Sequence, residues 1–85
     1  MNMQTRIREK LEQAFSPEEL EVVDESEQHR GHAGWREGGE THFRVEIAAS
    51  ALSPMSRLAR HRAIHAALGK DLIARIHALE LIVTA

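Results

Sequence analysis

The chain has 85 residues and a formal net charge of −2, with 42% hydrophobic and 28% charged residues. This composition is typical of a small globular domain and excludes a disordered or collagen-like chain. The absence of cysteine excludes a disulfide framework, a thiolate nucleophile and any metal site built only from cysteine.

No apolar run approaches the length of a membrane span, and the N-terminal segment has no signal-like apolar core. We therefore expect a single domain over residues 1–85, in the cytoplasm and without membrane contact.

The N-terminal part of the chain predicts a helix followed by a strand. Apolar side chains recur with helical spacing over residues 5–15, and Pro17 cannot continue that helix. Ser16 and Glu19 have the spacing of a capping box, which predicts one further short turn. Residues 20–24 are β-branched at their centre and predict a strand.

A second strand is predicted over residues 41–48, where apolar and polar side chains alternate. Phe43 belongs to the apolar face of this strand, and His42 lies on the opposite face, where we expect it to be solvated. Between the two strands lie four of the five glycines of the chain, which predicts a loop.

The C-terminal part predicts two helices and a last strand. Ser53 is placed to cap a helix whose first residue is Pro54, and Gly69 is placed to end it. Residues 70–75 add one or two helical turns, and alternation over residues 77–83 predicts the strand. The inner stripe of the main helix is drawn through Leu58, His61, Ile64, His65 and Leu68, and extends to Leu72.

The resulting order is α-β-β-α-α-β. Because the last strand follows a helical crossover, we expect it to pair in parallel with its neighbour, in the right-handed sense. The sequence therefore predicts an α+β fold, a three-stranded mixed sheet with its helices packed on one face.

The sequence contains no phosphate-binding loop, no HExxH motif and no serine-centred triad, so we expect no enzymatic activity. Its six histidines are the main candidates for chemistry. His61 and His65 lie one helical turn apart, a spacing that can hold a metal ion. Their place on or beside the inner stripe favours hydrogen-bonded packing instead.

His29, His32 and His77 form a separate group. The first two lie in the predicted loop and the third opens the last strand. A loop and a strand end can converge at one rim of a small sheet. Neutral imidazoles suit zinc, copper or iron. A site with two imidazole ligands has too few ligands to be closed, so a partner would have to complete it. A polar loop without a ligand is the alternative.

Positive charge gathers in the second part of the chain, where residues 52–85 carry 5 Lys/Arg against 2 Asp/Glu. Arg57, Arg60 and Arg62 are expected to project largely away from the inner stripe of the main helix. They could contact phosphates, and the simpler interpretation is a solvated helix face.

Four segments resemble the BolA family: LEVVDES (20–26), GETHFRV (39–45), SRLARHRAIHAAL (56–68) and IHALEL (76–81). The resemblance runs over nearly the whole chain and implies the class II KH-like form of the α-β-β-α-α-β fold. It also implies a non-enzymatic partner of a monothiol glutaredoxin, sharing a labile [2Fe–2S] cluster in iron–sulfur trafficking or in iron and redox regulation.

The same resemblance implies the ligands of that cluster. The glutaredoxin would supply a cysteine and a bound glutathione thiol. The BolA side would supply the histidine of the HAL motif, His77, and a loop residue that falls on His29 in the ESxxH segment. His32 is the alternative to His29. Two imidazoles with two thiolates have the proportions of a Rieske centre.

Some bacterial members of the family are DNA-binding transcriptional regulators of the stress response. The resemblance therefore implies a second hypothesis, that this protein binds DNA. The residues that would contact DNA are Arg57, Arg60, Arg62 and Lys70. The family usually has F-x-G in the turn before the main helix, where this chain has residues 52–54, LSP. Proline offers no backbone N–H to a phosphate, so this departure disfavours DNA binding. The free protein is expected to be a monomer or a weak homodimer.

Overall fold

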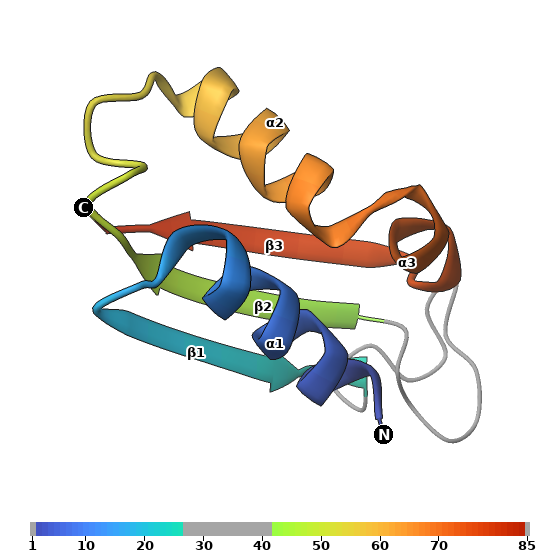
Figure 1. Cartoon of the computed structure of the whole chain (residues 1–85). Coiled ribbons are helices and arrows are strands. Elements are labelled where there is room, and N and C mark those ends of the chain that lie inside the picture. Colours follow the sequence, from blue (N-terminus) through green and yellow to red (C-terminus); the bar gives the residue numbers. More distant parts are fainter. Residues whose placement is uncertain (1, 27–41, 85) are drawn as a thin grey trace.

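The computed structural model describes residues 2–26 and 42–84. In Figure 1 the sheet forms one layer, with α1 in front of it and α2 above β3. None of the described helices is long and apolar enough to cross a membrane. The elements follow the predicted order, with bounds α1 Met3–Phe15, β1 Glu19–Asp24, β2 His42–Ala48, α2 Arg57–Leu68, α3 Lys70–Arg75 and β3 Ala78–Val83.

The sheet is mixed, with β2 at its centre. β1 pairs with β2 in antiparallel fashion, which places Val22 opposite Val45. β3 pairs with β2 in parallel, which places Leu81 opposite Val45. The parallel pairing arises because α2 and α3 carry the chain back to the end of the sheet at which β2 begins. The predicted α+β fold with a three-stranded mixed sheet is confirmed.

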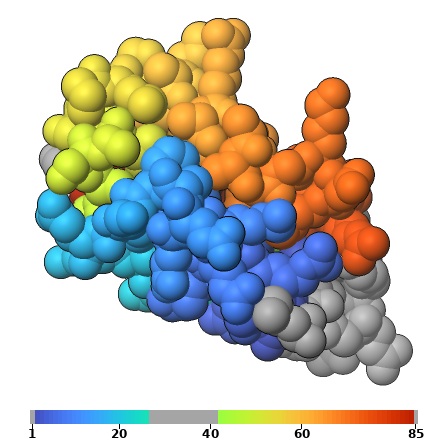
Figure 2. All heavy atoms as spheres, viewed as in Figure 1, coloured from blue at the N-terminus to red at the C-terminus, as the bar shows by residue number. Residues whose placement is uncertain are grey.

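The helices pack on one face of this sheet around an aliphatic core. Ile7 and Leu11 of α1, Val45 of β2 and Ile64 of α2 are completely buried. Phe43 belongs to the same cluster. The space-filling view in Figure 2 shows α1 closing the front of the molecule, with α2 and α3 along its upper part. The helical spacing of α1 and the alternation of β2 together account for this one-sided core.

The main helix begins later than predicted. Its N-cap is Ser56, whose side chain accepts a hydrogen bond from the backbone N–H of Ala59. Backbone hydrogen bonds fold residues 49–55 into successive turns, so Pro54 lies in a turn and not in the helix. The prediction of Ser53 as the cap was wrong because a second serine, three residues on, offers the same capping group beyond the proline.

The buried stripe of α2 is rotated relative to the predicted one. Ile64 and Leu68 are buried as expected, but Leu58 is 60% exposed and His65 is exposed. The reason lies in Arg60, which is half-buried and donates hydrogen bonds of 2.8 and 2.9 Å to two carbonyl oxygens of the preceding turn. These bonds turn the Arg60 side of the helix toward the protein and the Leu58 side toward solvent.

The predicted short turn after α1 was also wrong. Ser16 ends α1 in the left-handed conformation, with φ 46°, and Glu19 already belongs to β1. The N–H of Glu18 donates to the carbonyl oxygen of Ala48 at 2.8 Å, so the chain enters the sheet directly. The predicted end of the main helix at Gly69 is confirmed.

Candidate functional site

Three strand ends meet at one rim of the sheet. β2 and β3 are parallel and both begin there, and β1, which is antiparallel to β2, ends there. The rim therefore gathers His77, which precedes β3, with Ser26 and His42, the residues that flank segment 27–41. In Figure 1 this rim is at the right, beside α3.

His77 enters the rim directly from α3. The residue before it, Ile76, is 8% exposed and has extended backbone, so it anchors the connection between α3 and β3 in the core. The side chain of His77, which follows at the bend before β3, is exposed.

His42 does not lie where the sequence predicts. It is only 5% exposed, and the centroid of its ring lies 5.3 Å from that of His77, with 55° between the ring planes. The register explains the contact, because His42 pairs with Ala78, the residue that follows His77. The prediction of a solvated His42 was wrong because alternation assigns a residue to a face of the sheet and does not say what covers the rim.

The backbone of His42 is held by the end of β1. The N–H of Glu25 donates to the carbonyl oxygen of His42 at 2.8 Å, and the N–H of His42 donates to Oγ of Ser26 at 3.2 Å. Ser26 is 1% exposed, and both its N–H and its hydroxyl donate to Oδ1 of Asp24. This network fixes the two points at which segment 27–41 joins the sheet.

The donor set of the rim suits a shared metal centre more than a closed one. It offers the exposed imidazole of His77, with the imidazole of His42 buried behind it. Residues 2–26 and 42–84 contain no group of three or more metal-ligating side chains. Four ligands are needed for a closed tetrahedral site, so other ligands would have to complete it. The predicted ligands His29 and His32 lie outside the described residues.

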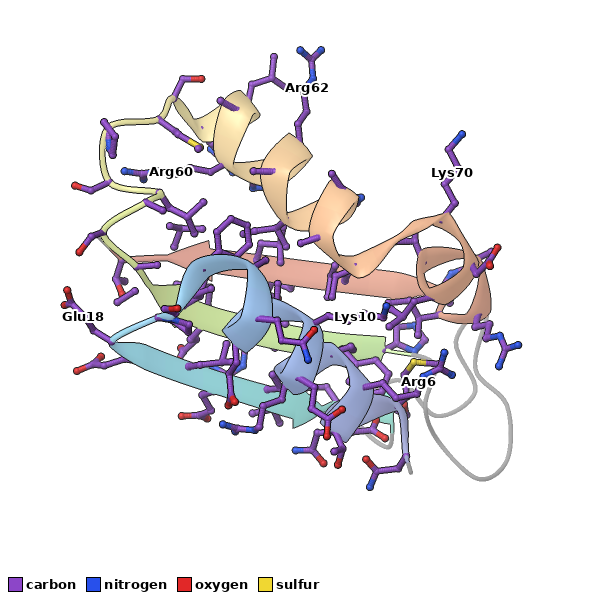
Figure 3. All side chains as sticks on the ribbon, viewed as in Figure 1. Arg6, Lys10, Glu18, Arg60, Arg62 and Lys70 are labelled. Atoms are coloured by element: carbon purple, nitrogen blue, oxygen red, sulfur yellow. The ribbon has the colours of Figure 1, made fainter. Side chains whose placement is uncertain are left out.

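The four basic residues predicted to contact phosphate are spread along α2 and α3. Arg57, Arg62 and Lys70 are exposed, and Figure 3 shows Arg62 and Lys70 pointing away from the sheet. Arg60 does not project away as predicted, because its guanidinium bonds to the turn before α2. The structure thus leaves three of the four available to a phosphate backbone.

Residues 11–85 match the family model described as BolA-like protein. The chain belongs to the BolA family. It is 51% identical over 80 residues to a protein of the cobS 5′ region in Sinorhizobium sp, covering 93% of this chain and 86% of that relative. It is 42% identical over 81 residues to the DNA-binding transcriptional regulator BolA of Escherichia coli, covering 95% of this chain and 73% of that relative.

The BolA-type fold is also seen in a solved structure. The BolA domain of SufE1 from Arabidopsis thaliana has a TM-score of 0.83 at 42% sequence identity, covering 99% of this chain and 92% of that one. BolA-like protein 1 of Pongo abelii is a longer relative, and this chain spans 55% of its length at 49% identity.

The open face of the sheet, which the helices do not cover, is acidic near the rim. Arg44 of β2 is 30% exposed and lies 3.3 to 3.9 Å from carboxylate oxygens of Glu21, Glu25 and Glu46. One guanidinium thus faces three carboxylates, and the excess negative charge repels a phosphate backbone. Among the described surfaces, the α2–α3 side suits a nucleic acid better than the open sheet face does.

The helix histidines are separate from the rim. His61 is half-buried and His65 is exposed, on either side of Arg62. The prediction that both pack near the inner stripe was wrong for His65, since Arg60 sets the rotation of α2. His61 instead lines a groove between α2 and the far end of β3.

Proposed function

We propose that this BolA-family protein is a non-enzymatic partner of a monothiol glutaredoxin and co-ligates a labile [2Fe–2S] cluster through histidines. It would act in the cytoplasm, in iron–sulfur cluster trafficking or in iron and redox regulation. The observation that carries the proposal is the position of His77, exposed at the rim where both ends of segment 27–41 join the sheet.

The chain length from the rim supports a second ligand from that segment. His29 follows Ser26 by three residues, which span at most about 11 Å when fully extended. His32 follows it by six residues and has a limit of about 21 Å. Both limits allow a ligand at the rim. His29 holds the ligand position that the family resemblance assigns within the ESxxH segment, so we propose His29 as the second ligand and keep His32 as its alternative.

The chemistry of the donors fits a cluster divided between two proteins. The chain has no cysteine, so the thiolates would come from the glutaredoxin cysteine and its bound glutathione. Imidazole in place of thiolate raises the reduction potential of such a cluster. A histidine must be neutral to bind a metal, so histidine ligation in general also depends on proton concentration. Both properties suit a cluster that is passed on or used as a sensor.

The proposal is tested by reconstituting the cluster on the protein mixed with a monothiol glutaredoxin and recording visible circular dichroism. We expect a spectrum distinct from that of the glutaredoxin homodimer and altered or lost in His77→Ala. The control is His61→Ala, a histidine beside the far end of β3, which should leave the spectrum unchanged. An unchanged spectrum in His77→Ala contradicts the assignment, and single and double substitutions of His29 and His32 identify the second ligand.

Binding to DNA through α2 and α3 is the second candidate function. It is favoured by the exposed Arg57, Arg62 and Lys70, and by the 42% identity to the Escherichia coli regulator. Each lost phosphate contact should lower the slope of log affinity against log salt by about 1. We therefore expect weaker, less salt-dependent binding in Arg62→Ala and Lys70→Ala. Cluster binding should be unaffected by both, and an unchanged salt slope in both contradicts DNA binding at this surface.

A further inference from the structure

The two rings at the rim differ in their surroundings. His42 is 5% exposed, whereas His77, the proposed ligand, is exposed to solvent. An exposed side chain ordinarily samples several rotamers, and a ligand in several rotamers binds more weakly because it must be ordered first. The ring of His42 lies against that of His77 at 5.3 Å, within the range of about 4.5–7 Å for aromatic contacts.

We propose that His42 is a positioning residue for His77: its buried ring holds the exposed imidazole in one orientation and presets it as a metal ligand. This inference rests on the ligand role proposed for His77. The role of His42 is to limit the rotation of a neighbouring side chain, which requires a flat ring fixed in place behind it.

The position of His42 is fixed from three sides. Its carbonyl oxygen accepts from the N–H of Glu25 at 2.8 Å, and its own N–H donates to Ser26 Oγ at 3.2 Å. On its other side it pairs with Ala78 of β3 in the parallel ladder. With both backbone groups bonded and the side chain buried, His42 is the rigid partner in the contact and His77 is the one whose rotation is restricted.

The contrast in exposure also argues that His42 supports a ligand and is not itself the ligand. A ligand shared with a second protein must be reachable from outside, as His77 is and His42 is not. The proposed role of His42 therefore needs a flat ring in contact with His77 and does not need a nitrogen atom bound to the metal. Phenylalanine retains a flat ring without nitrogen, so His42→Phe separates the two roles.

The first measurement uses the free protein, without metal or partner. Side-chain coupling constants and ¹³C relaxation of the His77 ring report how many rotamers it samples. We expect one dominant rotamer in the unsubstituted protein and in His42→Phe, and rotamer averaging in His42→Ala. His61→Ala, on α2, is the control and should leave the His77 couplings unchanged.

The second measurement uses the reconstituted complex with a monothiol glutaredoxin, in which the protein carries ¹⁵N-labelled histidine. Pulsed EPR of the reduced cluster reports the nitrogen hyperfine coupling of the bound imidazole. We expect a sharp coupling in the unsubstituted protein and in His42→Phe. In His42→Ala we expect the nitrogen hyperfine coupling to be broadened or diminished. We also expect the complex to lose its cluster several-fold faster.

Each outcome decides one question. The positioning role is overturned if the His77 side chain samples the same rotamers in His42→Ala as in the unsubstituted protein. It is also overturned if His42→Phe gives the same rotamer averaging as His42→Ala. If His42→Ala does not fold, His42→Leu fills the buried space without a flat ring and should still give averaged His77 couplings; retained order there overturns the proposal. Failure of the unsubstituted protein to form a shared cluster overturns the proposed function, while the couplings in the free protein still decide whether His42 positions His77.

Discussion

Nε of Arg60 donates a hydrogen bond of 2.8 Å to the carbonyl oxygen of Leu52, which joins the first turn of α2 to a fully buried residue of the β2–α2 connection. A second bond, of 2.9 Å, runs from Nη2 of the same guanidinium to the carbonyl oxygen of Ser53. One arginine thus holds the start of α2 against the turn and sets the rotation of the helix.

Arg60→Ala should lower the free energy of unfolding by about 1–3 kcal/mol, because the carbonyl oxygen of the buried residue Leu52 then loses a charged donor. Arg60→Lys should recover only part of this loss, since a single ammonium cannot reproduce the two-pronged geometry of a guanidinium. Urea unfolding measures both. The matched control is Arg62→Ala, an exposed arginine on the same helix, expected to change stability by less than about 0.5 kcal/mol. Equal losses in Arg60→Ala and Arg62→Ala would contradict the anchoring role.

The rotation of α2 predicts opposite outcomes for two large apolar residues. Ile64 is fully buried, so Ile64→Ala should cost about 2–4 kcal/mol of unfolding free energy. Leu58 is 60% exposed, so Leu58→Ala should cost less than about 0.5 kcal/mol. Chemical denaturation of the two variants under the same conditions checks the difference. A cost near 2 kcal/mol for Leu58→Ala would support the stripe predicted from the sequence.

Local sequence patterns predict the elements of this protein well because each pattern has a single physical period. Alternation around Phe43 identifies β2, and helical spacing identifies α1. The stripe of α2 was placed wrongly because apolar spacing there admits more than one rotation. What chooses between them is the pair of bonds from Arg60 to the preceding turn, and these are tertiary contacts that no helical period contains.

The candidate site illustrates the same limit. The position of His77 at the start of the last strand follows from alternation, and the rim follows from parallel pairing. The burial of His42 does not follow from either, because it depends on tertiary contacts at the rim, among them the contact with the ring of His77. One local signal was present: Asp24 and Ser26 have the spacing at which an aspartate accepts from a backbone N–H two residues on. That turn brings Ser26 under the N–H of His42.

Gly69 occupies a backbone conformation that side chains strongly disfavour, with φ 87° and ψ 152°. An added Cβ would meet nothing within 4 Å, so the cost of a substitution comes from the backbone and not from a clash. We expect Gly69→Ala to lose about 1–3 kcal/mol of unfolding free energy. Gly69→Ser should lose about the same, because the space is open. A loss that grows with side-chain size in thermal or urea unfolding would instead indicate packing.

Ser26 links the ends of two strands at the rim, accepting from the N–H of His42 and donating to Asp24. Ser26→Ala leaves the N–H of His42 without this acceptor in a buried place, at an expected cost of about 1–3 kcal/mol. Compared with the unsubstituted protein, Ser26→Ala should accelerate hydrogen exchange more at the amides of His42 and Glu25 than at those in the middle of β2.

Ser50→Ala is the matched control, because its hydroxyl donates to Glu18 at 3.0 Å on the exposed surface and its loss should change stability by less than about 0.5 kcal/mol. Uniformly faster exchange along β2 in Ser26→Ala would indicate global destabilisation and contradict a local role at the rim. If the increase is local, the ring of His77 should also sample more rotamers. The backbone of His42 would then lack its hydrogen bond to Ser26, and the His42 ring would hold His77 less firmly.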